Sequence, residues 1–239
     1  MHLVNNCLQF IQSRLWPGHC VLCGAQTRAW LDLCRGCRDD LPLLPHACRR
    51  CAHPLPAGAG PECGQCQKLP PWYDSAHCPF VYGAPLDWLV IGLKFHGRLE
   101  NARILGHLLA DSLATPSRAA PESIIPVPLH PRRLRERGFN QAVELARPVA
   151  ARLGIPVDTR TCRRILETRQ QSVLTAPERR RNLRGAFTMR APCSRSHVAL
   201  LDDVMSTGHT LNELARTLKH AGVERVEVWS VARATRNGA

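Results

Sequence analysis

A chain of 239 residues is long enough to bury a hydrophobic core, as one large domain or as a medium domain with a small one attached. Its formal net charge of +13 comes from 29 Arg and three Lys against 19 acidic residues, a balance that predicts an anionic partner, although a coding preference for Arg would give the same composition. No segment approaches the roughly 18 apolar residues of a membrane span and the N-terminus lacks a secretory signal, so we expect a cytoplasmic protein without a membrane span.

The N-terminal part of the chain is rich in cysteine. Residues 1–16 could form a short amphipathic helix, and ten of the twelve cysteines lie between Cys7 and Cys78. Four regularly spaced CxxC pairs stand out: Cys20 and Cys23, Cys34 and Cys37, Cys48 and Cys51, Cys63 and Cys66. A CxxC pair lets two thiolates bind one metal ion from a tight turn, and two pairs complete the tetrahedral S4 site that Zn²⁺ prefers.

We therefore expect two closed, structural zinc sites in a small module over residues 1–70. Sequential pairing would give a double zinc ribbon, whereas a cross-braced module would use alternate pairs, and the spacing leaves this choice open. Free or redox-active cysteines are the alternative, disfavoured by the regular spacing. His19, His46 and His53 lie next to the pairs and are expected to be bystanders, because the cysteines already complete both sites.

Strands and helices alternate over the predicted second domain, residues 71–239. In chain order, strands are expected at 76–83, 123–129, 197–204 and 225–232, and helices at 86–97, 105–113, 140–154 and 211–221. The polar, Arg-rich segment 166–183 lacks periodicity and is expected to be a mobile loop that becomes ordered on a ligand, and residues 169–184 are expected to become protected when an anionic ligand binds. This alternation predicts an α/β fold with a parallel sheet and helices on its faces.

The sharpest local signal is VALLDDVMSTGHT at 198–210. Its apolar run predicts a buried strand that brings Asp202 and Asp203 to the carboxyl end of the sheet, where two carboxylates can accept hydrogen bonds from vicinal ribose hydroxyls. The next five residues would surround a phosphate at the start of a helix: Ser206, Thr207, Gly208, His209 and Thr210. Thr210 and Glu213 match a capping box.

Two other interpretations of this segment compete with a sugar-phosphate site. A Walker B strand also ends in acidic residues, but GxxxxGK[ST] is absent from the chain. A plain strand, turn and helix with acidic residues at a surface edge is the second.

These residues resemble the motif that binds phosphoribosyl pyrophosphate (PRPP) in type I phosphoribosyltransferases. Over nearly its full length the chain resembles the ComF/GntX family, through the cysteine module and through IGLKFHGR (91–98), PVPLHPRRLRERGFNQA (126–142) and QQSVLTAPERRRNLRGAF (170–187). The resemblance implies a type I phosphoribosyltransferase-like fold and a cytoplasmic protein linked to DNA uptake in natural competence or to use of external DNA. Met205, Ser206 and His209 depart slightly from the usual motif, but Ser206 keeps a hydroxyl.

In such transferases pyrophosphate leaves the ribose as the anomeric carbon becomes cationic, so catalysis needs Mg²⁺ and protein cations. Asp202 and Asp203 are the expected catalytic residues. Candidates for the pyrophosphate are Lys94, His130, Arg132, Arg137 and Asn140, each of which could equally be a surface group or a DNA contact.

Two functions remain open from the sequence. The first is a PRPP-binding protein or a phosphoribosyltransferase (a pentosyl-transferring glycosyltransferase) whose acceptor substrate the motif does not identify. The second is a single-stranded DNA-binding adaptor of the DNA-uptake or recombination proteins with a non-catalytic or sensory PRPP site. The Arg content favours the adaptor, whereas the few aromatic residues, five Phe, five Trp and two Tyr, disfavour it.

Overall fold

The computed structural model describes residues 18–28, 30–114, 119–167 and 184–235. The predicted helix over 1–16 and residues 168–183 of the Arg-rich segment lie outside the described residues. Among the helices that are described, none combines the length and the apolar character needed to span a bilayer.

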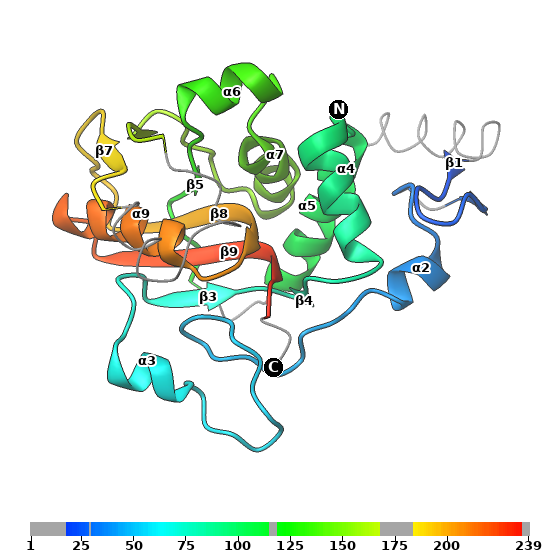
Figure 1. The fold of residues 1–239 in the computed structure, drawn as a ribbon, viewed down its shortest axis with the longest axis horizontal. Coiled ribbons are helices and arrows are strands. Elements are labelled where there is room, and N and C mark those ends of the chain that lie inside the picture. Colours follow the sequence, from blue (N-terminus) through cyan, green and yellow to red (C-terminus); the bar gives the residue numbers. More distant parts are fainter. Residues whose placement is uncertain (1–17, 29, 115–118, 168–183, 236–239) are drawn as a thin grey trace.

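A parallel sheet forms the centre of the molecule (Figure 1). Its strands are β3 (Ser75–His77), β4 (Phe80–Val81), β5 (Ser123–Pro126), β8 (His197–Met205) and β9 (Arg225–Arg233). They run in the order β3-β9-β8-β5, with β4 also paired to β9, and every pairing is parallel. The long strands β8 and β9 are almost continuously buried, because a parallel sheet is covered on both faces, and this explains their unbroken apolar runs.

Helices cover both faces of the sheet, which confirms the predicted fold class. One face carries α4 (Leu86–His96), α5 (Leu99–Leu113) and α7 (Gln141–Leu153), whose apolar stripes form one core with alternate residues of β8 such as Ala199 and Leu201. The other face carries α9 (His209–His220) and the antiparallel pair β6 (Cys162–Arg164) and β7 (Phe187–Met189), which form a second core with Val198 and Leu200. Successive residues of β8 therefore face different cores.

Several elements differ from the sequence-based expectation. The strand predicted at 76–83 is two short strands, because Pro79 between them has no N–H to donate to a ladder. Helix α5 begins at Leu99, earlier than predicted. Its first turns lack an apolar pattern because the polar Asn101 occupies a buried position, where its Nδ2 donates to the carbonyl of Leu89 at 3.0 Å. A short helix α6 (Pro131–Arg137) begins on a proline, and its mostly charged sequence gives no apolar period.

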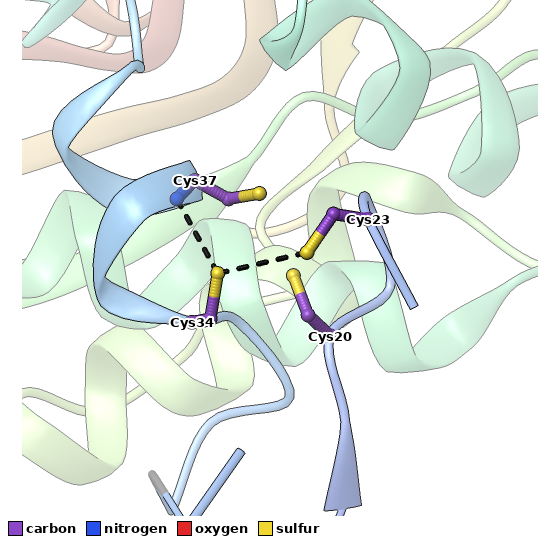
Figure 2. Close-up of side chains that lie close together, drawn as sticks. All are labelled: Cys20, Cys23, Cys34 and Cys37. Atoms are coloured by element: carbon purple, nitrogen blue, oxygen red, sulfur yellow. Dashed lines mark hydrogen bonds between the residues drawn. The ribbon is translucent and has the colours of Figure 1, made fainter. Parts of the chain in front are cut away.

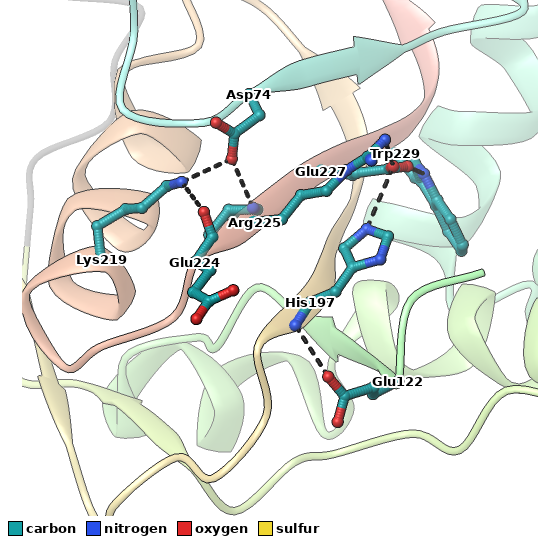
Figure 3. Close-up of polar contacts among 9 residues, drawn as sticks. Asp74, Glu122, His197, Lys219, Glu224, Arg225, Glu227 and Trp229 are labelled. Carbon is teal, nitrogen blue, oxygen red and sulfur yellow. Dashed lines mark hydrogen bonds and ion pairs between the residues drawn. The ribbon is translucent and has the colours of Figure 1, made fainter. Parts of the chain in front are cut away.

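Polar contacts tie the amino ends of three strands together (Figure 3). The fully buried carboxylate of Glu227 on β9 lies 2.8 Å from Arg225 Nη2 and 3.2 Å from His197 Nε2 of β8, and it accepts from Trp229 Nε1 at 3.1 Å. Just before β3, Asp74 accepts from Lys219 Nζ and from the backbone N–H of Val226, both at 2.7 Å. The contacts of Glu227 satisfy a charge that would be costly to bury alone, whereas Asp74 is exposed.

The cysteine module lies beside this sheet and consists of short elements. Its first half holds the antiparallel pair β1 (Gly18–His19) and β2 (Gln26–Thr27) and the helix α2 (Arg35–Asp39), and its second half holds α3 (Gly64–Lys68). In the first half, ion pairs of Arg38 with Asp111 (3.2 Å) and of Asp32 with Arg103 (2.7 Å) connect the module to α5.

Candidate functional site

The first cysteine cluster contains Cys20, Cys23, Cys34 and Cys37, whose Sγ atoms all lie within 4.8 Å of one another (Figure 2). Cys20 and Cys23 lie in the turn between β1 and β2, and Cys34 is the N-cap of α2. The Sγ atoms of Cys23 and Cys34 are 3.7 Å apart, which matches the roughly 3.8 Å edge of a tetrahedron with Zn–S bonds of about 2.3 Å. The backbone N–H of Cys37 donates to Cys34 Sγ at 3.4 Å, a contact that stabilises a thiolate.

The second cluster repeats this design with Cys48, Cys51, Cys63 and Cys66. Cys63 is the N-cap of α3, its Sγ lies 3.7 Å from Cys51 Sγ, and its N–H donates to Cys48 Sγ at 3.3 Å. We call the two clusters with their surrounding turns the first and the second ribbon. The CxxC pairs are therefore combined sequentially. The four soft sulfur ligands of each cluster fit one structural Zn²⁺ ion, with no coordination position left for a substrate.

A cleft of about 510 Å³ opens at the carboxyl end of β8, and it gathers most of the predicted ligand residues. The two aspartates and the whole segment 204–211 line it. Five basic side chains also line it: Lys94, His130, Arg133, Arg137 and Arg164. Ligands of open α/β folds bind at this end of the sheet, and four Lys and Arg side chains line the cleft against three carboxylates, Asp202, Asp203 and Glu167, a balance that suits an anion.

Asp202 and Asp203 lie at the end of β8 on opposite sides of the strand. Asp203 is buried and faces α4, where Lys94 Nζ lies 2.5 Å from its Oδ2. Burial alone would lower the pKa of Lys94, but the carboxylates of Asp203 and Asp202 outweigh it and the net effect raises that pKa. Lys94 therefore stays charged and neutralises part of the acidic pair.

Asp202 is in the opposite situation, because burial and the neighbouring Asp203 carboxylate raise its pKa to about 8, with Lys94 acting against the shift. Its Oδ1 accepts from the backbone N–H of Asp203 at 2.9 Å. This raised pKa favours the protonated form of the carboxyl group at neutral pH in the absence of ligand. A ligand that donates hydrogen bonds to it, or a cation, favours the ionised form and displaces that proton.

The segment 206–210 forms the turn into α9. Gly208 is the N-cap of this helix with φ of +73°, and it is buried, so that a Cβ there would lie 2.8 Å from Met205 Cε and 3.2 Å from Tyr73 Oη. The positive φ is the main reason why this turn requires glycine, since the terminal methyl group of Met205 belongs to a flexible side chain that can shift. The hydroxyl of Thr207 lies 3.1 Å from His209 Nδ1, and the first turn of α9 follows directly, where the helix dipole favours an anion.

The predicted capping box of Thr210 and Glu213 is wrong. The helix begins at His209, and no side chain caps it. Glu213 instead accepts from the backbone N–H of Gly185 at 2.7 Å and pairs with Arg216 at 2.7 Å.

The predicted pyrophosphate residues divide into two groups. Lys94, His130 and Arg137 line the cleft, and Arg137 donates to Gln141 Oε1 at 2.5 Å. Arg132 and Asn140 do not line it. Arg132 pairs with Glu136 (3.0 Å) and Glu167 (3.3 Å), and Asn140 caps α7 by accepting from Ala142 N–H at 3.0 Å while it donates to the carbonyl of Val127 at 3.0 Å.

Sequence reasoning missed Arg133 and Arg164 in the cleft. Arg133 follows the predicted candidate Arg132 on helix α6, which the sequence did not predict. Only an expected helix would have allowed its periodicity to identify Arg133 as the residue that faces the cleft. Arg164 belongs to the equally unpredicted strand β6. Burial lowers its pKa, and the Asp202 carboxylate counteracts that effect, which places Arg164 within electrostatic range of the acidic pair.

Comparisons with known proteins match both parts of the chain. The family described as "Double zinc ribbon domain" matches residues 11–85, which include all eight clustered cysteines. The family described as "Phosphoribosyl transferase domain" matches residues 140–238, which include Asp202, Asp203 and the turn into α9.

Relatives align along most of the chain. Competence protein F of Haemophilus influenzae is 37% identical over 209 residues, which are 84% of this chain and 90% of that protein. DNA utilization protein YhgH of Salmonella typhi is 37% identical over 225 residues, which are 91% of this chain and 97% of that protein. Among solved structures, TT1426 from Thermus thermophilus is 20% identical, covers 58% of this chain and 85% of its own, and has a TM-score of 0.34, too low to support an argument.

Proposed function

This chain belongs to the ComF/GntX family, which includes Competence protein F and DNA utilization protein YhgH, and from this premise we propose that its cleft binds PRPP with Mg²⁺ during the handling of external DNA. The observation that carries the proposal is the combination in one cleft of an acidic pair, a glycine turn at a helix N-terminus and five basic side chains. An aspartate pair with a phosphate turn is the pattern that a ribose 5-phosphate requires.

In this proposal each part of PRPP has its own partners. The turn 206–210 holds the 5-phosphate, and Asp202 and Asp203 accept hydrogen bonds from the ribose hydroxyls. The pyrophosphate lies against the basic side chains that line the cleft, chiefly Lys94, His130 and Arg137, together with Arg133 and Arg164. Asp202 and Asp203 are the carboxylates that would hold Mg²⁺, and the ion would supply further positive charge to the leaving group.

If the bound PRPP reacts, the chain's own residues act by electrostatics. As the bond between the anomeric carbon and pyrophosphate breaks, the basic residues stabilise the negative charge that develops on the leaving oxygens. The acidic pair holds the ribose, whose anomeric carbon carries the developing positive charge. The acceptor that would take the ribosyl group is left unassigned, because the motif residues contact only PRPP.

Calorimetry with Mg²⁺-PRPP tests the proposal directly. We expect the wild-type protein to bind and the double variant Asp202→Ala, Asp203→Ala to lose at least tenfold in affinity, since each unpaired hydroxyl costs roughly 1 to 3 kcal/mol. Zinc content and the far-UV spectrum serve as controls for folding. Absence of binding by the wild-type protein would refute the proposal, and so would equal affinity of the double variant.

The same double variant also tests the link to DNA. We expect it to fail to restore transformation in a competent strain that lacks its own family member, if the uptake function depends on the PRPP site. Full restoration would assign the uptake function to other parts of the chain.

One observation favours a second candidate, a surface for single-stranded DNA. Trp88 on α4 is 66% exposed, and Phe95, two turns further along the same helix, is 68% exposed at the edge of the basic cleft. Exposed aromatic rings beside Arg side chains are what sequence-tolerant single-strand binders use. Trp88→Ala should weaken binding of a fluorescent oligothymidylate by at least fivefold and leave PRPP affinity intact; an unchanged oligonucleotide affinity would exclude this surface.

We also propose that the zinc module ends near residue 70, with domains at 1–70 and 71–239, because β3 begins the central sheet at Ser75. Eight thiols arranged for metal ions support a reducing compartment, so the proposal places the protein in the cytoplasm.

A further inference from the structure

A buried arginine connects the second ribbon to the turn that precedes α9. Arg233, the last residue of β9, is only 8% exposed. Its Nη1 donates to the carbonyl oxygens of Met205 (2.9 Å), Ala234 (2.8 Å) and Ser206. Its Nε donates at 3.0 Å to the carbonyl oxygen of Cys51, one of the four cysteines of the second ribbon. One guanidinium group therefore holds the start of the turn and a metal-binding loop together.

These contacts fix the orientation of the turn. A segment that binds a phosphate must direct its N–H groups and hydroxyls toward the anion and its carbonyl oxygens away, because carbonyl oxygens repel phosphate. Arg233 holds the carbonyls of Met205 and Ser206 on the side of the sheet. Arginine suits this task because its planar group presents several donors in fixed directions.

Tyr73 supports the same turn from the same side. It is buried, its hydroxyl lies next to Gly208, and it shares one apolar core with Ala52 of the second ribbon and with Met205. The turn thus packs on residues that belong to, or directly follow, the second ribbon.

The first ribbon makes different contacts. Its ion pairs lead to Arg103 and Asp111 of α5, and the ring of Trp30 packs on the ring of His107, also on α5, with centroids 4.3 Å apart. Its buried Cys20 belongs to the core on the α4 and α5 face of the sheet. The two ribbons therefore support opposite faces.

We propose that the second ribbon sets the conformation of the turn 205–208 through Arg233, so that Zn²⁺ at Cys48, Cys51, Cys63 and Cys66 is required for the ligand-binding shape of the cleft. Arg233 is a positioning residue: it acts through the backbone of the turn. The ligand in this inference rests on the proposed function, whereas the coupling between ribbon and turn is measurable without any ligand.

The first experiment compares Arg233→Lys with Arg225→Lys at the other end of the same strand, where the side chain is half-exposed and pairs with Glu227. Lysine keeps the charge at both sites but cannot reach four carbonyls at once. We expect both variants to keep two zinc ions. Hydrogen exchange of amides 205–208 should become at least tenfold faster in Arg233→Lys, with at least a tenfold loss of Mg²⁺-PRPP affinity, and neither should change in Arg225→Lys.

The outcomes distinguish the coupling between the second ribbon and the turn from the proposed binding of PRPP. Unchanged exchange in Arg233→Lys would overturn the coupling. If the wild-type protein does not bind Mg²⁺-PRPP, the proposed function fails, while the exchange data still decide the coupling.

The second experiment removes one metal ion at a time with Cys66→Ser or Cys37→Ser, which occupy equivalent positions in the two ribbons. Each variant should lose one zinc ion by elemental analysis. Exchange at 205–208 should accelerate at least tenfold more in Cys66→Ser than in Cys37→Ser, and equal acceleration would overturn the proposal. If Cys66→Ser does not fold, the Arg233→Lys comparison alone decides.

Discussion

Replacing Lys94 by methionine removes the ammonium group that lies 2.5 Å from Asp203 and keeps most of the apolar bulk of the side chain. Breaking a buried ion pair by removing one partner costs roughly 3 to 5 kcal/mol, because the other charge remains buried and unpaired. Lys94 keeps 23% of its side chain exposed, so we expect a smaller loss, about 2 to 3 kcal/mol in the free energy of unfolding at pH 7.

Urea denaturation followed by circular dichroism measures this loss. The raised pKa of Lys94 means that its contribution is fully present below the ordinary lysine pKa and disappears only as the pH rises through the higher folded-state value. Lys94→Met combined with Asp203→Asn removes both charges and should recover at least about 1 kcal/mol relative to the sum of the single effects. A loss below about 0.5 kcal/mol, or strict additivity, would refute the reasoning.

Three further predictions concern metal, pH and the turn. Elemental analysis should find two Zn²⁺ per chain, and a preparation that is folded yet free of zinc would contradict the S4 sites. Because the pKa of Asp202 is about 8 and ribose hydroxyls or Mg²⁺ prefer the ionised carboxylate, PRPP affinity should rise about fivefold between pH 7 and 8 and about tenfold by pH 9, where it levels off, with proton release on binding; Asp202→Asn should flatten this profile. Gly208→Ala should destabilise the protein by about 1 to 3 kcal/mol and weaken PRPP binding, as denaturation and calorimetry would show, because it introduces both backbone strain and a contact with Met205.

The sequence predicts those parts of the molecule whose physics is local. The CxxC spacing identifies the eight cysteines of the two clusters, and the apolar run before Asp202 identifies the strand that carries both acidic residues. The choice between sequential and cross-braced pairing could not be made, because either arrangement satisfies the same spacing. Helix α6 and strands β6 and β7 were missed, since tertiary contacts rather than an apolar period define such short elements.

Non-local contacts account for the other differences. Glu213 fits a capping box, but Gly185 and Arg216 compete for its carboxylate, and the first of these lies 28 residues away in the sequence. Similarly, Arg233 carries no motif that would distinguish it among 29 arginines, and only the fold brings it to Cys51.

The strand order has a consequence for how the chain is made. Each ribbon closes over a short stretch, Cys20 to Cys37 or Cys48 to Cys66, so both can bind metal soon after they leave the ribosome. In contrast, the strand that pairs with β3, β4 and β8 is β9, which is synthesised last. Until it arrives, three strands present unpaired edges, which are templates for aggregation. A chain that stalls before residue 225 is therefore expected to emerge with its ribbons formed and to depend on chaperones for everything else.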